Sequence, residues 1–331
     1  MTRLKKNERN VIVKSHMPPA KKAQSTKERS KRYIPNLAEF YFRPTHDWSH
    51  DEASLLFAKT EPPKGVELDT IQFEDCVQGM KRLPNNSIDL VIADPPFGIG
   101  FDGKSSVYNR DENLVVEGYE EVKDYHAFTG AWLAELPRIM KSSSTAYVFS
   151  GWTNLESVLQ GARKVGLVTL NHLIWHYPFG VYTKKRFVSS HYHIVVLVKD
   201  PKKYFFNKIE NYPEDVWLFK RKYRTGQTKN ATTLPLDVVS RCVDFSSRPG
   251  DIVLDPFMGN GTTAIAAQSS FRHFIGFEIN EQLEPLLEEE ISKVEPGQSY
   301  TPYNERLPTI EELSERYPQA YREYVRREEK D

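Results

Sequence analysis

The stretch LVIADPPFGIG, residues 90–100, runs from four apolar residues directly into Asp94, two prolines and Phe97. The same order recurs in IVLDPFMGNGTT, residues 252–263, where an apolar run leads to Asp255 and a proline. Uninterrupted apolar runs are typical of strands in a parallel sheet that helices cover on both faces. The two stretches therefore predict an α/β protein with a doubly wound, mostly parallel sheet of about seven strands.

The rest of the chain alternates between strand-like and helix-like patterns. The segments predicted as strands span residues 69–75, 87–96, 144–151, 167–178, 191–200, 251–256 and 273–280. The segments with helical spacing of apolar residues span 76–84, 125–141, 155–166, 234–247, 262–270 and 308–331. Ligands of such sheets bind at the carboxyl ends of the strands, which is where Asp94 and Asp255 stand.

The composition is that of a globular protein in a reducing compartment. Apolar residues make up 39% and charged residues 27% of the 331 residues. No apolar run approaches the ~20 residues that span a bilayer, and the N-terminus has no apolar signal sequence. The two cysteines, Cys76 and Cys242, are too few for a disulfide framework. We therefore expect a cytoplasmic protein with no membrane partner.

The two ends of the chain are strongly charged. Residues 1–35 carry eleven Lys or Arg against two Glu, and we expect a disordered basic arm there. Such an arm either adds affinity for a polyanion or acts only as a solubilising tail. Residues 36–67 are predicted to be an extension that packs on the main body. Residues 297–331 are predicted to be a charged helical extension, which either docks on the body or forms an oligomer contact.

Each of the two stretches forms an acid-proline corner, Asp94-Pro95 in the first and Asp255-Pro256 in the second. The second corner, with the loop that follows it, has the pattern of a nucleoside site. GNGTT, residues 259–263, brings backbone close to a ligand but lacks both the P-loop signature and the full G-x-G-x-x-G. A nucleoside without a pyrophosphate fits this loop. About twenty residues later the next strand ends at Glu278, where an acidic side chain can accept both ribose hydroxyls.

The first corner has the pattern of an amine acceptor. Pro95 and Pro96 fix φ and remove two backbone donors, which leaves the Asp94 carboxylate and nearby carbonyls beside the Phe97 ring. A planar group with an NH₂ substituent fits such a surface. The competing interpretation is a strand end with a helix-capping Asp and an incidental Phe.

These two motifs carry a family resemblance. DPPF resembles the catalytic Asp-Pro-Pro-Tyr/Phe motif of the S-adenosylmethionine-dependent DNA amino-methyltransferases, and LDPFMGNGTT resembles their cofactor loop. The catalytic motif comes first, which is the order of the permuted beta group, and the similarity covers roughly residues 68–295. It implies a circularly permuted, Rossmann-like methyltransferase domain over 68–296. The chain termini would then lie between the strand that ends at Glu278 and the one that ends at Asp75.

The resemblance also implies the site residues. The implied catalytic set is Asp94, Pro95, Pro96 and Phe97. Asp94 and the Pro95 carbonyl accept hydrogen bonds from the target amino group. Phe97, in place of the commoner tyrosine, stacks on the flipped base. In the cofactor set, Glu278 binds the ribose and Asp75 the adenine amino group of S-adenosylmethionine. The members of the cofactor set are Asp75, Asp255, Phe257, Gly259, Asn260, Gly261, Thr262 and Glu278, with Thr263 as a cap or a further contact.

The implied reaction is direct methyl transfer to an exocyclic amino group of a base flipped out of double-stranded DNA. Asp94 favours adenine N6 as the target, because Ser is commoner there in cytosine-N4 enzymes; cytosine N4 stays as the alternative. RNA guanine-N2 and protein-glutamine methyltransferases share similar motifs but place the cofactor loop first. A catalytically silent DNA-binding module would not need the intact acids and glycines.

DNA recognition is predicted in the basic, aromatic region 179–230, with an ordinary solvated loop as the alternative interpretation. The candidate contacts are Lys184, Lys185, Arg186, Lys220, Arg221, Lys222 and Arg224. A cognate restriction endonuclease and a homodimer are further candidate partners, and a prokaryotic source would place the protein at the nucleoid. We expect no metal site, because the histidines at 172, 176, 191 and 193 lie in apolar strand-like runs without Cys or carboxylate at ligand spacing.

Overall fold

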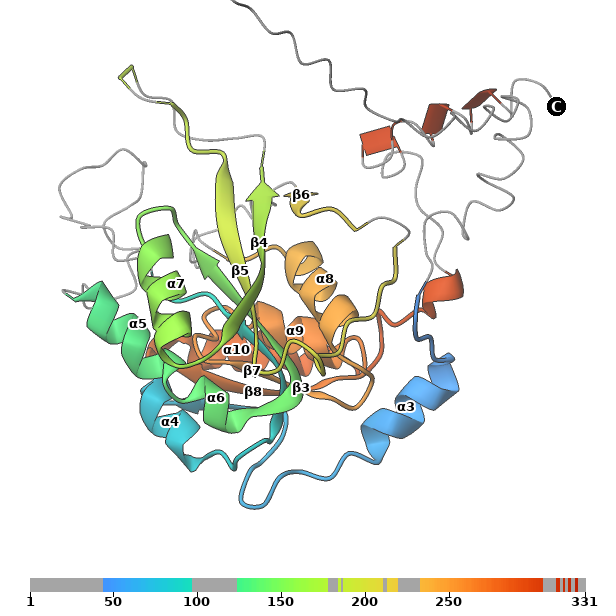
Figure 1. Ribbon diagram of the computed structural model, residues 1–331. Helices are drawn as coiled ribbons and strands as arrows, with labels where there is room; N and C mark the ends of the chain where they lie inside the picture. Colours follow the sequence, from blue (N-terminus) through green and yellow to red (C-terminus); the bar gives the residue numbers. More distant parts are fainter. Residues whose placement is uncertain are drawn as a thin grey trace, which may run out of the picture.

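The computed structural model describes residues 44–96, 124–177, 184–185, 187–210, 213–219 and 233–305, and a few residues between 314 and 326. Within these residues an eight-stranded sheet has the order β1-β8-β7-β2-β3-β5-β4-β6 (Figure 1). The strands are β1 (Thr70–Phe73), β2 (Ile88–Ala93), β3 (Met140–Ser150), β4 (Val168–His176), β5 (His191–Val198), β6 (Val216–Leu218), β7 (Ile252–Asp255) and β8 (His273–Glu278).

Helices cover both faces of this sheet (Figure 1). The helices of the described residues are α3 (His50–Ala58), α4 (Cys76–Arg82), α5 (Tyr125–Leu133), α6 (Leu136–Ile139), α7 (Leu155–Lys164), α8 (Leu236–Ser246), α9 (Thr262–Gln268) and α10 (Glu284–Ser292), with 3-10 turns η2 (Glu281–Leu283) and η3 (Tyr303–Glu305). Of these, α4 to α10 lie against the sheet. Side chains of α4 to α7 share one apolar cluster with the sheet, and side chains of α8 to α10 share another. The doubly wound α/β prediction is therefore confirmed.

Strand β2 shows why its sequence has no polar alternation. All six of its residues are buried, with Val91 and Ala93 in the cluster beneath α4 to α7 and Leu90 and Ile92 in the cluster beneath α8 to α10. A strand with helices on both faces places every side chain in a core. At about 25 cal/mol per Å² of buried apolar surface, each large side chain contributes roughly 1.5–3 kcal/mol.

The strand order confirms the circular permutation. β1 and β8 are parallel neighbours, with Phe73 opposite Glu278, so the strands that come first and last along the described chain lie side by side in the sheet. Strands β1, β8, β7, β2 and β3 are parallel, whereas β5 runs antiparallel to both β3 and β4. The sequence predicted about seven strands; the eighth is β6, whose three residues are too short to show a pattern.

The prediction of a single helix over residues 125–141 is wrong. The segment divides into α5 and α6, and Met140 already begins β3. Pro137 lies in the first turn of α6 and has no N–H to donate to the carbonyl of Leu133, so α5 ends there.

The predicted terminal extensions are described only in part. The arm over residues 1–35 lies outside the described residues, as does most of 308–331. Helix α3 begins at a capping box formed by Ser49 and Glu52, and its Ala53 packs with Phe271 and Tyr300. In the described part of the chain, no helix combines the length and the apolar character needed to cross a bilayer.

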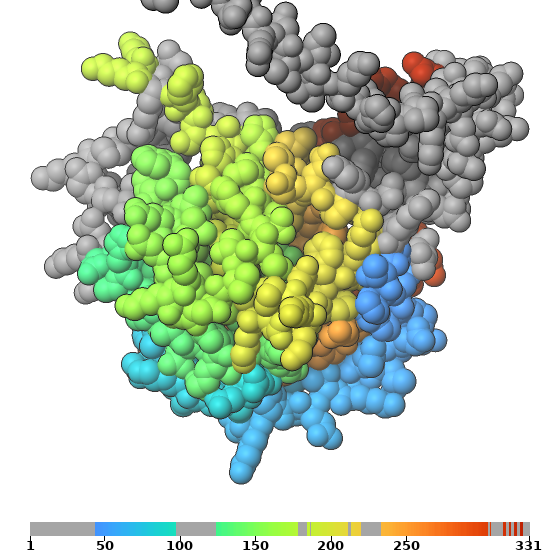
Figure 2. All heavy atoms as spheres, in the orientation of Figure 1, coloured from blue at the N-terminus to red at the C-terminus, as the bar shows by residue number. Residues whose placement is uncertain are grey.

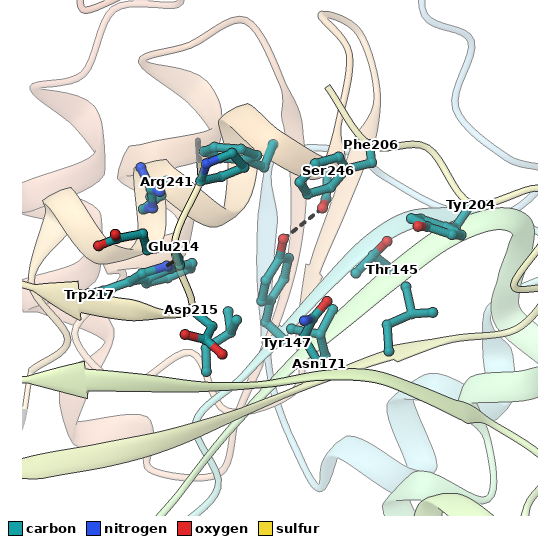
Figure 3. Close-up of a pocket in the computed structure, with 15 residues that line it drawn as sticks. Thr145, Tyr147, Asn171, Tyr204, Phe206, Glu214, Asp215, Trp217, Arg241 and Ser246 are labelled. Atoms are coloured by element: carbon teal, nitrogen blue, oxygen red, sulfur yellow. Dashed lines mark hydrogen bonds between the residues drawn. The ribbon is translucent and has the colours of Figure 1, made fainter. Parts of the chain in front are cut away.

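A cavity of about 180 Å³ lies between β3, β4 and α8, on the face of the sheet opposite α5 (Figure 3). The Tyr147 hydroxyl and the Ser246 hydroxyl are hydrogen-bonded in its wall, 2.8 Å apart. The Arg241 guanidinium pairs with the buried Glu210 and lies 5.0 Å from the Trp217 ring centre.

Candidate active site

The two acid-proline corners lie side by side. β2 and β7 are parallel neighbours, with Leu90 opposite Val253 and Val91 opposite Leu254. Asp94 directly follows β2 and Asp255 ends β7, so both carboxylates stand at the same edge of the sheet. This is the edge at which ligands of open α/β sheets bind.

At the first corner the described residues are Asp94, Pro95 and Pro96. Asp94 and Pro96 are half-buried and Pro95 is buried. Phe97, the fourth member of the predicted catalytic set, lies outside the described residues. The structure thus places the carboxylate and the Pro95 carbonyl at the sheet edge.

At the second corner the loop is held by backbone hydrogen bonds. Asp255 is 4% exposed, and its Oδ1 accepts the N–H of Phe257 at 2.9 Å. The N–H of Met258 donates to the Phe277 carbonyl at 2.9 Å, which ties the loop to β8. Gly259 has φ +52° and Gly261 has φ +78°, a left-handed conformation that L residues rarely adopt. The GNG pattern therefore reflects a real backbone requirement.

The second corner also leaves room for a ligand. A Cβ added at Gly259 would meet only the carbonyl oxygen of Phe257 within 4 Å, at 3.8 Å. The Asn260 Oδ1 is buried and has no hydrogen-bond partner among the described residues, although its amide nitrogen donates to Thr233. Sequence reasoning missed Thr233, which belongs to no motif. An open glycine beside a buried acceptor fits a ligand with amine or hydroxyl donors.

Glu278 connects the loop to the end of β8. It is 4% exposed, and its two carboxylate oxygens accept the N–H of Gly259 at 2.8 Å and the N–H of Asn280 at 2.9 Å. A carboxylate has about four acceptor positions, so these two backbone bonds are compatible with further donors. Glu278 therefore orders the loop at the place where the sequence predicts a ribose contact.

Asp75 stands beside Glu278 because β1 and β8 are neighbours. It is exposed and caps α4, its Oδ1 accepting the N–H of Gln78 at 3.1 Å. The helix cap accounts for one carboxylate oxygen and leaves the other for a ligand. The cap explains why Asp is suited to this position even before any ligand binds.

Burial sets the protonation of Asp255. It raises the pKa of this carboxyl to about 7, while hydrogen bonds from the Thr263 side chain and the Phe257 backbone act in the opposite direction and the charge of Glu278 adds to the increase. The carboxyl serves chiefly to hold the loop, since Thr263 and Phe257 both contact it.

Phe257 faces the core rather than the solvent. Its ring meets that of Trp132 edge-on at 5.4 Å and lies 5.9 Å from that of Phe128, both on α5. This contact anchors the loop to α5. Thr262 begins α9 directly after Gly261 and is half-buried.

The predicted DNA contacts fall mostly outside the described residues. Lys184 and Lys185 are described and exposed, and nearby Phe187 is 98% exposed. The described residues before β5 project from the body of the protein (Figures 1 and 2). The candidates that lie outside the described residues are Arg186, Lys220, Arg221, Lys222 and Arg224.

Two of the strand histidines contact each other. The Nε2 of His172 and the Nδ1 of His193 are 2.7 Å apart, and burial, with the charges of His172 and His191, lowers the pKa of His193 to about 4. No set of three metal-binding side chains comes together among the residues that the structure covers.

The fold and this edge define a Rossmann-like methyltransferase sheet, and solved structures share it. M1.HpyAVI, solved with SAM, is 22% identical with a TM-score of 0.53, over 67% of this chain and 98% of that one. The cytosine-N4-specific PvuII DNA methyltransferase is 14% identical with a TM-score of 0.52, over 72% of this chain and 99% of that one. At these identities the likeness concerns the fold alone.

Sequence comparison gives the family. Residues 88–289 match the family model of the N6/N4 methyltransferases, described as DNA methylase. The DNA adenine methyltransferase YhdJ of Escherichia coli is 32% identical, over 67% of this chain and 82% of that protein. The type II methyltransferase M.HinfI of Haemophilus influenzae is 29% identical, over 70% of each chain. The chain belongs to this DNA methylase family, which confirms the resemblance found in DPPF and DPFMGNGTT.

Proposed function

We propose that this protein transfers the methyl group of S-adenosylmethionine to the exocyclic amino group of a base flipped out of double-stranded DNA, with adenine N6 as the target. The observation that carries the proposal is the pairing of β2 with β7, which puts Asp94 beside the Gly259–Gly261 loop. The similarity to YhdJ, named a DNA adenine methyltransferase, supports adenine as the base.

The cofactor would be held along the edge formed by β7, β8 and β1. S-adenosylmethionine supplies a methyl group already activated by its sulfonium. Glu278 holds the ribose, and Asp75 on the neighbouring strand holds the adenine amino group. The open face of Gly259 admits the body of the cofactor. Asp255, through the backbone of Phe257, keeps the loop in place.

The first corner prepares the amine. The lone pair of an exocyclic nitrogen is delocalised into the base, so the amine is a weak nucleophile. Asp94 and the Pro95 carbonyl accept hydrogen bonds from its two N–H groups, which restores electron density to the nitrogen. Positioning of the two reactants contributes ~7–11 kcal/mol. Phe97 stacks on the flipped base, and stacking of ~1–3 kcal/mol offsets part of the cost of flipping.

Cytosine N4 is the alternative target, because it too has an exocyclic amino group that can donate to the same acceptors. A cognate restriction endonuclease and a homodimer are further proposals, the first supported by the type II methyltransferases among the similar proteins. We also propose that the protein works in the cytoplasm, where DNA of a prokaryote is accessible.

The test is methylation of DNA by the purified protein. Unmethylated DNA and S-adenosylmethionine are incubated with wild type, Asp94→Ala, or the control Asp51→Ala, which alters an exposed residue of α3. The DNA is digested to nucleosides for mass spectrometry. We expect N6-methyl-2′-deoxyadenosine from wild type and Asp51→Ala but not from Asp94→Ala. N4-methyl-2′-deoxycytidine would change the target base, and the absence of any methylated nucleoside would refute the DNA assignment.

A further inference from the structure

Helix α5 connects the cofactor loop with the catalytic corner. Trp132 and Phe128 contact the Phe257 ring of the loop. Tyr125 and Thr129, one helical turn apart, form a second row on α5. The sequence patterns did not single out either residue, because α5 contains no family motif.

Helices α5 and α7 lie side by side at this place (Figure 1). Gly161 of α7 permits the close approach, since a Cβ there would lie 2.7 Å from Leu133 and 3.6 Å from the Thr129 methyl group. Asn154 is the N-cap residue of α7 and is 5% exposed. An Asn at this position usually caps its helix, yet the Asn154 side chain makes no capping hydrogen bond.

Other buried polar groups near Asn154 compete with the cap for its side chain. Its amide nitrogen, the Thr129 hydroxyl and the Tyr125 hydroxyl are all buried, and none has a hydrogen-bond partner within normal geometry among the described residues. Asn154 follows β3, which runs parallel to β2, so it stands at the same edge of the sheet as Asp94. Burial and the charge of Asp94 raise the pKa of Tyr125 to about 12, and Thr129 and Asn154 act to lower it, which agrees with a position of the Tyr125 hydroxyl among these groups. Three buried polar groups thus lie near this edge without closing their contacts.

We propose that Tyr125 is a positioning residue, whose hydroxyl donates to the Asp94 carboxylate when the target base enters, while Thr129 and Asn154 donate to the phenol oxygen. The proposal rests on the proposed function and adds residues to that site. One carboxylate oxygen is then fixed by Tyr125 and the other is presented to the amino group. Hydrogen bonds of catalytic groups are often long before substrate binds, in agreement with the unclosed contacts here.

The test compares Tyr125→Phe with the matched control Tyr147→Phe. Tyr147 is also buried and hydrogen-bonded, but to Ser246 on the opposite face of the sheet (Figure 3). At saturating DNA and S-adenosylmethionine, Tyr125→Phe is expected to lower the rate of methyl transfer roughly tenfold to a hundredfold, the effect of losing a hydrogen bond to a charged group. The Kd of S-adenosylmethionine and the unfolding midpoint should stay at wild-type values.

A second comparison separates action through Asp94 from a structural effect. In single-turnover assays with radiolabelled cofactor, Tyr125→Phe should cause no further loss in an Asp94→Asn background. A wild-type rate for Tyr125→Phe, a loss no larger than that of Tyr147→Phe, or equal losses with and without Asp94 would overturn the proposal. Failure of wild type to methylate DNA would instead refute the proposed function.

Discussion

The two glycines of the cofactor loop have different roles, and alanine at each position separates them. Both have a left-handed φ, +52° at Gly259 and +78° at Gly261, which costs an L residue roughly 1–2 kcal/mol. At Gly261 a Cβ would also lie 2.8 Å from the Leu287 side chain, an overpacking worth ~1–3 kcal/mol. A Cβ at Gly259 would have only the carbonyl oxygen of Phe257, in the same loop, within 4 Å, at 3.8 Å.

We therefore expect Gly261→Ala to lower the free energy of unfolding by about 2–5 kcal/mol and Gly259→Ala by only about 1–2 kcal/mol. Gly259→Ala should raise the Kd for S-adenosylmethionine at least tenfold, which corresponds to ~1.4 kcal/mol of binding free energy. The physical reason is that, in the proposed site, the cofactor approaches the backbone through the open space above Gly259.

Urea unfolding measures the stabilities, and isothermal titration calorimetry measures cofactor binding. Gly65→Ala is the matched control, because Gly65 has φ +77° and a Cβ there would meet no atom within 4 Å. It should reproduce the stability loss of Gly259→Ala and bind cofactor like wild type. Wild-type affinity in Gly259→Ala would refute the placement of the cofactor over this glycine.

Three further predictions concern charge. In the folded state the pKa of Asp255 is raised to about 7, above its unfolded value. Its contribution to the free energy of unfolding therefore falls as pH rises from about 4 to 7, with a limiting slope of about 1.4 kcal/mol per pH unit. Asp255→Asn should make the free energy of unfolding in urea depend less on pH over that window. Glu210→Gln should cost ~3–5 kcal/mol by leaving the buried Arg241 charge without its carboxylate, and adding Arg241→Met should recover stability in the same assay. Lys184→Ala with Lys185→Ala should reduce the salt dependence of DNA binding by about 0.9 per lost phosphate contact; an unchanged slope would favour the solvated-loop interpretation.

The features predictable from the sequence are those that a short segment specifies by itself. β2 and β7 read as apolar runs because both of their faces are buried, and Gly261 is specified by its own backbone angle. The cofactor-loop pattern therefore predicted both a nucleoside site and its place at a strand end. The permutation was predictable too, since it follows from the order of two motifs.

Other features depend on contacts between distant segments. β6 has only three residues and is defined by pairing with β4, which its own sequence does not reveal. Tyr125 and Asn154 meet because α5 and α7 pack closely at Gly161. Phe257 was expected to line the cofactor site, yet its contacts with α5 come from tertiary packing. No periodicity or motif in a single segment contains that information.

The strand order explains why a permuted chain keeps the same site. In the proposed mechanism the reaction needs β7 and β2 as parallel neighbours, so that the cofactor loop and Asp94 share one edge. The proposed mechanism also needs β1 beside β8, so that Asp75 and Glu278 can contact one nucleoside. Both requirements concern hydrogen bonds between strands, and neither requires a covalent connection from β8 to β1. The order of the segments along the chain can therefore be permuted between these two strands while the edge proposed to bind both substrates stays intact.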